Sequence, residues 1–201
     1  MVVIGLTGNF GTGKTEVAKI LAELGGVIIN ADELGHELLQ YHTQAYTKIL
    51  EAFGKSILKQ NGDIDRKKLS RLVFKDAAAL NKLNLIMHPR IYEMVIQKIE
   101  QYRKTGARVV VLEAALLIEA GWKPLVDQLW ATTAPPATIV RRLKAAKKLS
   151  EEQVLTRLKN QMPQEEKVKQ ADAVINTDCT IVELKARVTE LWNKLSLGKA
   201  R

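Results

Sequence analysis

Residues 2–16 read VVIGLTGNFGTGKTE, a stretch that predicts a strand, a glycine-rich loop and the start of a helix. Residues 2–6 form an apolar run that is long enough for a buried strand and too short for a helix. The run leads into GNFGTGKT at residues 8–15, which fits the phosphate-loop pattern G-x-x-x-x-G-K-[ST] at every position. Residues 14–24 then carry apolar side chains at helical spacing before two glycines end the pattern. Strand, glycine loop and helix in this order predict a binding site for a nucleoside triphosphate.

Each part of the loop has a predicted role. The backbone N–H groups of residues 11–16 are expected to point at phosphate oxygens, helped by the dipole of the following helix. Lys14 is expected to reach the β- and γ-phosphates, and the Thr15 hydroxyl to ligate Mg²⁺. The dinucleotide pattern G-x-G-x-x-G fails, because Glu16 stands where its third glycine is needed. The predicted ATP contacts of the loop are Gly8, Asn9, Phe10, Gly11, Thr12, Gly13, Lys14, Thr15 and Glu16.

The totals limit the class of protein. A chain of 201 residues with 46% hydrophobic residues can bury the core of one domain. No apolar run approaches the roughly 20 residues of a membrane span, and we expect no signal peptide before the first strand. The lone Cys179 gives no internal disulfide, and the scattered histidines 36, 42 and 88 lack zinc-site spacing. We expect a cytoplasmic protein that does not enter a membrane.

The formal charge of +9 has two interpretations, binding of nucleic acid or capture of small polyanions. Only 5% of the residues are aromatic, and no helix-turn-helix, RNA-stacking or zinc-finger signature is present. We therefore favour phosphate-rich metabolites as partners over nucleic acid.

Four further strands are predicted at residues 27–30, 108–113, 127–132 and 171–176. Together with the first strand they predict a P-loop α/β fold, in which a parallel five-stranded sheet lies between two layers of helices. Asp32 follows the second strand, where either a catalytic base or a helix N-cap would stand. Glu113 ends the third strand and is expected near Mg²⁺ through a water molecule, since it is longer than the usual Asp.

Helical patterns fill the remainder. Residues 33–104 predict a mainly helical excursion, in which His88 and Pro89 interrupt one helix over 77–87 and another over 91–103. A strongly basic segment at 138–148 precedes a helix at 151–162, which begins with the capping pattern of Ser150 and Gln153. This basic pair predicts a lid over the triphosphate. A closing helix at 181–195 and a frayed tail at 196–201 complete the chain.

From Val3 to about Leu195 the chain resembles the dephospho-coenzyme A kinase family. The phosphate loop alone is common to many enzymes, and the ordered set of further segments makes the resemblance specific. These segments are residues 31–34 with His36, residues 62–66, residues 87–89, residues 116–119, Arg157 with residues 161–163, and Lys167 with residues 171–176.

The resemblance implies transfer of the ATP γ-phosphoryl group to the ribose 3′-hydroxyl of dephospho-CoA, the last step of CoA synthesis. It implies a core at about 1–32, 106–136 and 170–195, a helical acceptor-binding region at about 33–105, and a lid at about 137–168. Two departures from the family pattern are Ala115 in place of a proline, and Ala146–Lys147 in place of an arginine followed by an acid.

The resemblance also implies roles for individual residues. Asp32 would be the catalytic base, with Lys14 stabilising charge on the transferred group. The further ATP contacts would be Arg141, Arg142, Arg157 and Asn176, and the acceptor contacts Asp32, His36, Arg66, His88, Leu116 and Glu119. Two alternatives stay open: another P-loop kinase that acts on a nucleoside or nucleotide, and an ATP-binding switch that phosphorylates no metabolite. The oligomeric state is not predicted.

Overall fold

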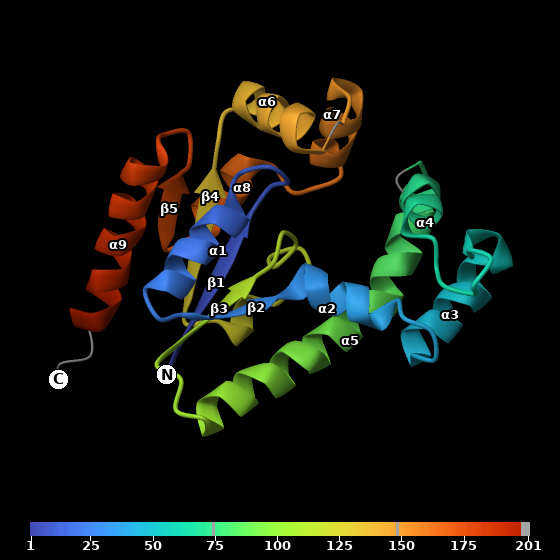
Figure 1. Ribbon diagram of the computed structural model, residues 1–201, viewed down its shortest axis with the longest axis horizontal. Helices are drawn as coiled ribbons and strands as arrows, with labels where there is room; N and C mark the ends of the chain where they lie inside the picture. The colour runs from blue at the N-terminus through green and yellow to red at the C-terminus, as the bar shows by residue number, and fades with distance from the viewer. Residues whose placement is uncertain (74, 148, 198–201) are drawn as a thin grey trace. The chain divides into compact units, whose positions relative to one another are not determined.

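The computed structural model describes residues 1–73, 75–147 and 149–197 (Figure 1). The chain divides into two compact units. One is formed by Met1–Asn30 together with the chain from Lys98 onward, and the other is Ala31–Gln97.

The first unit contains a five-stranded sheet in the order β2-β3-β1-β4-β5. Every pairing is parallel, and Val2 lies opposite Val109 while Ile4 lies opposite Gln128. The predicted sheet is therefore confirmed, with strand ends within two residues of the expected positions. The strands are β1 (Val2–Gly8), β2 (Val27–Asn30), β3 (Val109–Glu113), β4 (Gln128–Thr133) and β5 (Ala173–Asn176).

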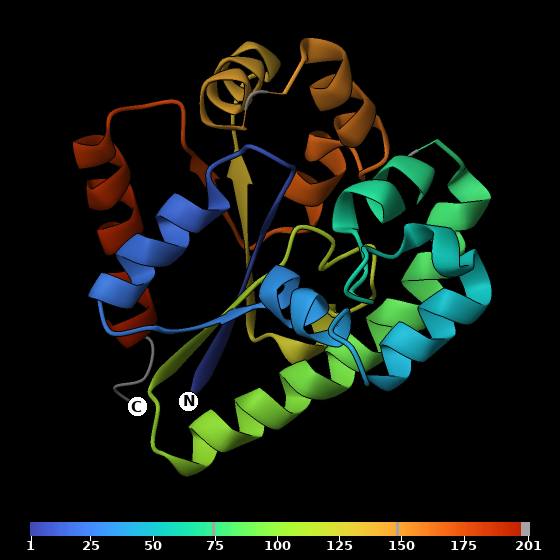
Figure 2. The same ribbon diagram turned by 45° about the vertical axis from the view of Figure 1, so that its right-hand side comes forward.

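Helices cover both faces of this sheet, which confirms the three layers. On one face, α1 (Lys14–Glu23) contacts α9 (Ile181–Leu197) (Figures 1 and 2). Their apolar side chains pack with Ile4 and Leu6 of β1. On the other face, α8 (Gln164–Gln170) contacts β1 and β4. Residues 114–126, which include the short helix η2 (Lys123–Leu125), also cover this face.

Two further helices of this unit follow β4, namely α6 (Pro136–Lys147) and α7 (Glu151–Lys159). The predicted capping box is present, because Ser150 accepts from Gln153 N and Gln153 accepts from Ser150 N. The prediction that this helix reaches residue 162 is wrong. Met162 precedes Pro163, and a residue before proline is disfavoured in the helical conformation. The helix α8 was not predicted, since its sequence QEEKVKQ has no apolar periodicity.

The second unit is helical, as predicted. Its elements are α2 (Ala31–Leu38), α3 (Gln44–Phe53), η1 (Lys55–Ile57), α4 (Arg66–Val73) and the larger part of α5 (Ala77–Lys104).

The expected interruption at His88–Pro89 is wrong, because α5 is one helix of 28 residues with Pro89 inside it. A proline within a helix removes one hydrogen bond and costs about 3 kcal/mol or more. Leu85, whose carbonyl loses that donor, is 77% exposed. The buried side chains of Met87, Ile91 and Val95 flank the proline, and their packing offsets the cost.

Within the described residues, no helix is long and apolar enough to cross a membrane. The predicted frayed tail is wrong for residues 196 and 197, which belong to α9. Residues 198–201 lie outside the described part of the chain.

Candidate functional site

The phosphate loop joins β1 to α1 through two glycines that no other residue would replace without strain. Gly13 is the N-cap of α1 with φ 83°, in the left-handed region. Gly8 has φ 146°, and a Cβ atom there would lie 2.2 Å from Thr132 Oγ1 and 2.6 Å from its carbonyl oxygen. The backbone can therefore pass close to β4 and turn its N–H groups inward.

The Lys14 side chain is buried and folds back across the loop. Its Nζ donates to the carbonyl oxygens of Gly8 at 2.8 Å and Asn9 at 3.2 Å. Thr12 fixes the middle of the loop: its Oγ1 donates to Asn9 O at 2.7 Å and lies 2.7 Å from Thr132 Oγ1. The ammonium group is thus held at the mouth of the loop, where an anion would bind.

Thr15 and Glu113 place two side-chain oxygen atoms beside the loop that could serve as metal ligands. Thr15 Oγ1 donates to Glu113 Oε1 at 2.9 Å, and Asn30 Nδ2 donates to Glu113 Oε2 at 3.2 Å. Because Glu113 accepts the hydrogen bond of the Thr15 hydroxyl, the oxygen lone pairs of Thr15 face elsewhere and can bind a cation. Hydroxyl and carboxylate oxygens suit Mg²⁺, which takes few protein ligands when phosphates supply others. The described residues contain no group of three or more His, Cys, Asp or Glu side chains that could hold a metal ion by themselves.

The predicted arginines occupy different positions in the first unit. Arg141 is exposed on α6. Arg142 donates to the Thr177 hydroxyl at 3.0 Å and to its carbonyl at 2.7 Å. Arg157 of α7 lies over the Phe10 ring, with its guanidinium carbon 5.0 Å from the ring centre. Asn176 ends β5, and its Oδ1 accepts from Asp178 N at 2.8 Å.

Residues 114–121 follow β3 and hold Leu116, which is half-buried, and Glu119. The Glu119 carboxylate accepts from Lys167 Nζ at 2.7 and 3.0 Å and from Met162 N at 3.1 Å. Lys167 is 1% exposed and also donates to Ala115 O at 2.6 Å. Burial lowers the pKa of Lys167, and the hydrogen bond to Glu119 opposes that shift. Lys167 was not predicted as a site residue, and its only sequence signal was its place in the family resemblance.

In the second unit, Asp32 is the second residue of α2 and is exposed. It lies within the first turn, so the alternative of an N-cap is wrong, because α2 already begins at Ala31. Its carboxylate is nevertheless favoured there by the helix dipole.

His36 is on the same helix and forms a hydrogen bond with Arg66, the first residue of α4. Burial and the neighbouring Arg66 lower the pKa of His36, while Asp32 and Glu33 act in the opposite direction. The neutral imidazole can accept from the guanidinium, and the protonated one cannot. His88 lies half-buried inside α5.

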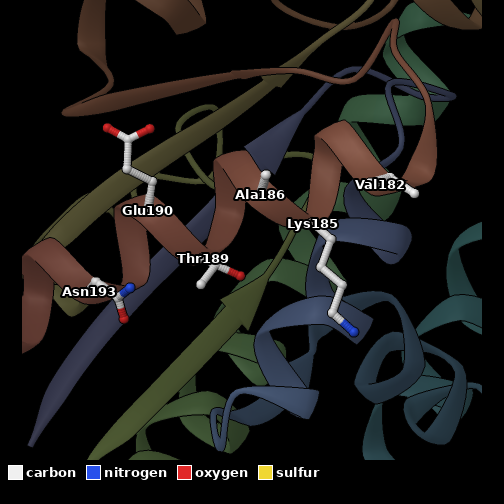
Figure 3. A pocket seen from close by; sticks show the side chains of 6 residues that line it. All are labelled: Val182, Lys185, Ala186, Thr189, Glu190 and Asn193. Atoms are coloured by element: carbon white, nitrogen blue, oxygen red, sulfur yellow. The ribbon is translucent and has the colours of Figure 1, made fainter.

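A surface pocket lies along one face of α9, outside the predicted site (Figure 3). Its lining consists of Val182, Lys185, Ala186, Thr189, Glu190 and Asn193. Figure 3 shows Lys185 and Glu190 pointing away from each other, so they offer no convergent pair of charges.

Comparisons with known proteins agree with this geometry. Residues 2–183 match the family model described as dephospho-CoA kinase. The chain is 43% identical over 188 residues to a dephospho-CoA kinase of Dehalococcoides mccartyi, and 94% of each chain is covered. The fold superposes with a TM-score of 0.81 on the crystal structure of TT1252 from Thermus thermophilus, at 30% identity over 96% of this chain and 97% of the other. The TM-score is 0.70 to a dephospho-CoA kinase from Campylobacter jejuni, at 26% identity over 98% of both chains.

Proposed function

This chain belongs to the dephospho-CoA kinase family, and from that premise we propose which of its residues perform the reaction. The reaction moves the γ-phosphoryl group of ATP to the ribose 3′-hydroxyl of dephospho-CoA, which gives CoA and ADP and completes CoA biosynthesis. The observation that carries the residue assignment is the phosphate loop, with Lys14 folded over its mouth and the Thr15–Glu113 pair beside it.

On the nucleotide side, the N–H groups of residues 11–16 bind the triphosphate, and Lys14 exchanges its carbonyl partners for phosphate oxygens. Arg157 and Arg141 add positive charge from α7 and α6. Such charges act mainly on the transition state, because phosphoryl transfer spreads negative charge over the equatorial oxygens. Arg142 and Asn176 hold the loop after β5, where we place the adenine.

Thr15 would hold Mg²⁺ directly, and Glu113 through water. When bound, the ion would neutralise negative charge on the phosphates. Glu113 keeps the Thr15 hydroxyl oriented, since it accepts a hydrogen bond from it.

On the acceptor side, Asp32 accepts the proton of the attacking 3′-hydroxyl. General-base catalysis of this kind contributes about 10²–10⁴-fold in rate. His36, Arg66, His88 and Leu116 bind dephospho-CoA, whose phosphates suit Arg66. Glu119 would also contact the acceptor, and its bond to Lys167 orders residues 114–121.

The region 33–105 is the acceptor-binding part, and the region of about 137–168 is the lid. The partners are the small molecules ATP and dephospho-CoA, without nucleic acid. We place the enzyme in the cytoplasm, because ATP is available there. The free thiol of Cys179 suits that reducing compartment.

The deciding experiment measures ADP release from ATP and Mg²⁺ with and without dephospho-CoA, together with the mass of the product. We expect ADP release that depends on dephospho-CoA and a product heavier by one phosphate. CoA itself is the control acceptor, because its 3′-position is already phosphorylated. Phosphorylation of a nucleoside or nucleotide instead would favour another P-loop kinase, and ATP binding without any phosphorylated product would favour a switch.

A further inference from the structure

The two halves of the phosphate loop are anchored to different parts of the first unit. The second half is attached to the strand ends: Thr12 Oγ1 lies 2.7 Å from Thr132 Oγ1, and Thr12 O accepts from Thr177 Oγ1 at 2.9 Å. Thr132 lies in β4, and Thr177 follows β5. This half also begins α1, so the sheet and the helix fix it.

The first half of the loop is attached to the connection between α7 and α8, residues 160–163, which we call the strap. Phe10 N donates to Gln161 Oε1 at 2.8 Å, and Asn9 Nδ2 donates to Met162 O at 3.1 Å. Asn9 is 6% exposed, so its bond is shielded from water. The N–H group of Phe10 is used on the strap and lies outside the run of residues 11–16 assigned to the triphosphate.

Phe10 links this attachment to Arg157 of α7. Its ring packs against the apolar cluster of α6 and α7, which includes Ile139 and Val154. The guanidinium of Arg157 lies over the same ring, 5.0 Å from its centre. A cation over an aromatic face is held at that place by attraction to the ring. Phe10 is therefore one of the groups that position Arg157.

The strap is also fixed from behind. Met162 N donates to Glu119 Oε1 at 3.1 Å, and the same carboxylate binds the buried ammonium of Lys167. The strap is thus held at both backbone groups of Met162. Its N–H group binds Glu119, and its carbonyl oxygen binds Asn9. Such a doubly held segment has little freedom to drift away from the loop.

We propose that Gln161 is a positioning residue for phosphoryl transfer, which holds Phe10 and, through its ring, the guanidinium of Arg157. The proposal rests on the proposed function of the phosphate loop. Loss of the Gln161 side chain should lower turnover and change nucleotide binding little. The N–H groups and Lys14, which bind the triphosphate, lie in the half of the loop that the strap does not hold.

The test replaces Gln161 by methionine, which has the same length and no strong acceptor. We expect kcat to fall by up to about tenfold, which is the upper range for loss of one hydrogen bond between neutral groups. The dissociation constant of ATP, measured by calorimetry without acceptor, should change less than about threefold. The matched control is Gln164→Met, because Gln164 Oε1 accepts from Ala134 N at 3.1 Å, a bond of the same kind between two residues outside the phosphate loop. Its kcat should stay within about twofold of the wild type.

A double substitution separates positioning from a general structural effect. If Gln161 acts through Arg157, the kcat of Gln161→Met/Arg157→Met should lie within about twofold of Arg157→Met alone. Multiplied losses, an unchanged kcat in Gln161→Met, or an equal loss in Gln164→Met would each overturn the proposal. Should Gln161→Met fail to fold, Phe10→Leu removes the ring under Arg157 and should lower kcat in the same way. A wild-type enzyme that makes no CoA would refute the proposed function instead.

Discussion

The ammonium group of Lys167 lies 2.7 Å from one carboxylate oxygen of Glu119 and 3.0 Å from the other, in a side chain that is 1% exposed. Its third hydrogen bond, to Ala115 O, uses the remaining donor. A buried charge is tolerated when all its hydrogen-bonding capacity is used in this way. The pair joins α8 to the segment that follows β3.

Replacing Lys167 by methionine should lower the free energy of unfolding by about 2–4 kcal/mol, because it leaves the Glu119 carboxylate without its partner. The value falls below that of a fully buried pair, since the Glu119 side chain is 21% exposed. Urea denaturation measures it. The matched control is Lys169→Met on the same helix, whose pair with Glu166 is exposed, so its loss should change the free energy of unfolding little. Equal losses in both variants would contradict the prediction.

Replacing Asp32 by asparagine should lower kcat by about 10²–10⁴-fold and leave the ATP dissociation constant within about twofold. The amide cannot take the proton of the acceptor hydroxyl, while the phosphate loop is unchanged. Lys14→Met should instead weaken ATP binding. Rapid-quench measurement of CoA formation and calorimetric titration with ATP separate the two effects. Glu33→Gln, the neighbouring acid in the first turn of α2, is the control and should keep nearly normal turnover.

Replacing Glu113 by glutamine should raise the Mg²⁺ concentration needed for half-maximal rate by about tenfold at fixed ATP. The substitution keeps an oxygen near the Thr15 hydroxyl and removes the negative charge. Excess Mg²⁺ should restore most of the rate, which distinguishes this effect from a folding defect. Thr15→Ser retains the hydroxyl and serves as the control. An unchanged Mg²⁺ dependence in Glu113→Gln would remove the acid from the metal site.

Replacing Arg66 by methionine should raise the pKa of His36. Burial is the larger cause of the lowered pKa and Arg66 the second, so the substitution removes part of the shift. The folded pKa of His36 lies below the unfolded value of about 6.5. The unfolded chain therefore takes up the proton first as the pH falls.

The stability contributed by neutral His36 is therefore complete above the pKa that His36 has in the unfolded chain. It is lost as the pH falls through the lower pKa that His36 has in the folded protein. Proton NMR titration of the His36 ring measures the pKa directly. Arg71→Met, on the same helix α4, is the control and should leave the titration unchanged. A lower pKa in Arg66→Met would refute the assigned cause.

The phosphate loop and the five strands could be predicted because their signals are local. Glycines at fixed positions, short apolar runs and the Ser150 cap each depend on a few neighbouring residues. The continuity of α5 through Pro89 could not be predicted. It depends on the exposure of Leu85 and on the buried side chains around the proline, which only the tertiary structure provides.

In the candidate site too, contacts with local sequence signals could be predicted, and contacts that depend on the tertiary structure could not. The Thr15–Glu113 bond follows from the loop pattern and from the end of a neighbouring strand. The contacts of Gln161 with Phe10 and of Lys167 with Glu119 join residues far apart in the sequence. No local pattern marks them, since polar residues at such spacing usually face solvent. The roles of Asp32, His36, Arg66 and His88 stay predictions.

The central position of β1 affects how the chain can fold. Val2 pairs with Val109 and Ile4 with Gln128, so both neighbours of the first strand come more than a hundred residues later in the sequence. On the ribosome, this apolar strand emerges long before either partner exists, with both of its edges unpaired. Loop-closure entropy makes such distant pairing slow, and unpaired strand edges promote aggregation. The nascent chain is therefore expected to depend on chaperones until β4 has been synthesised.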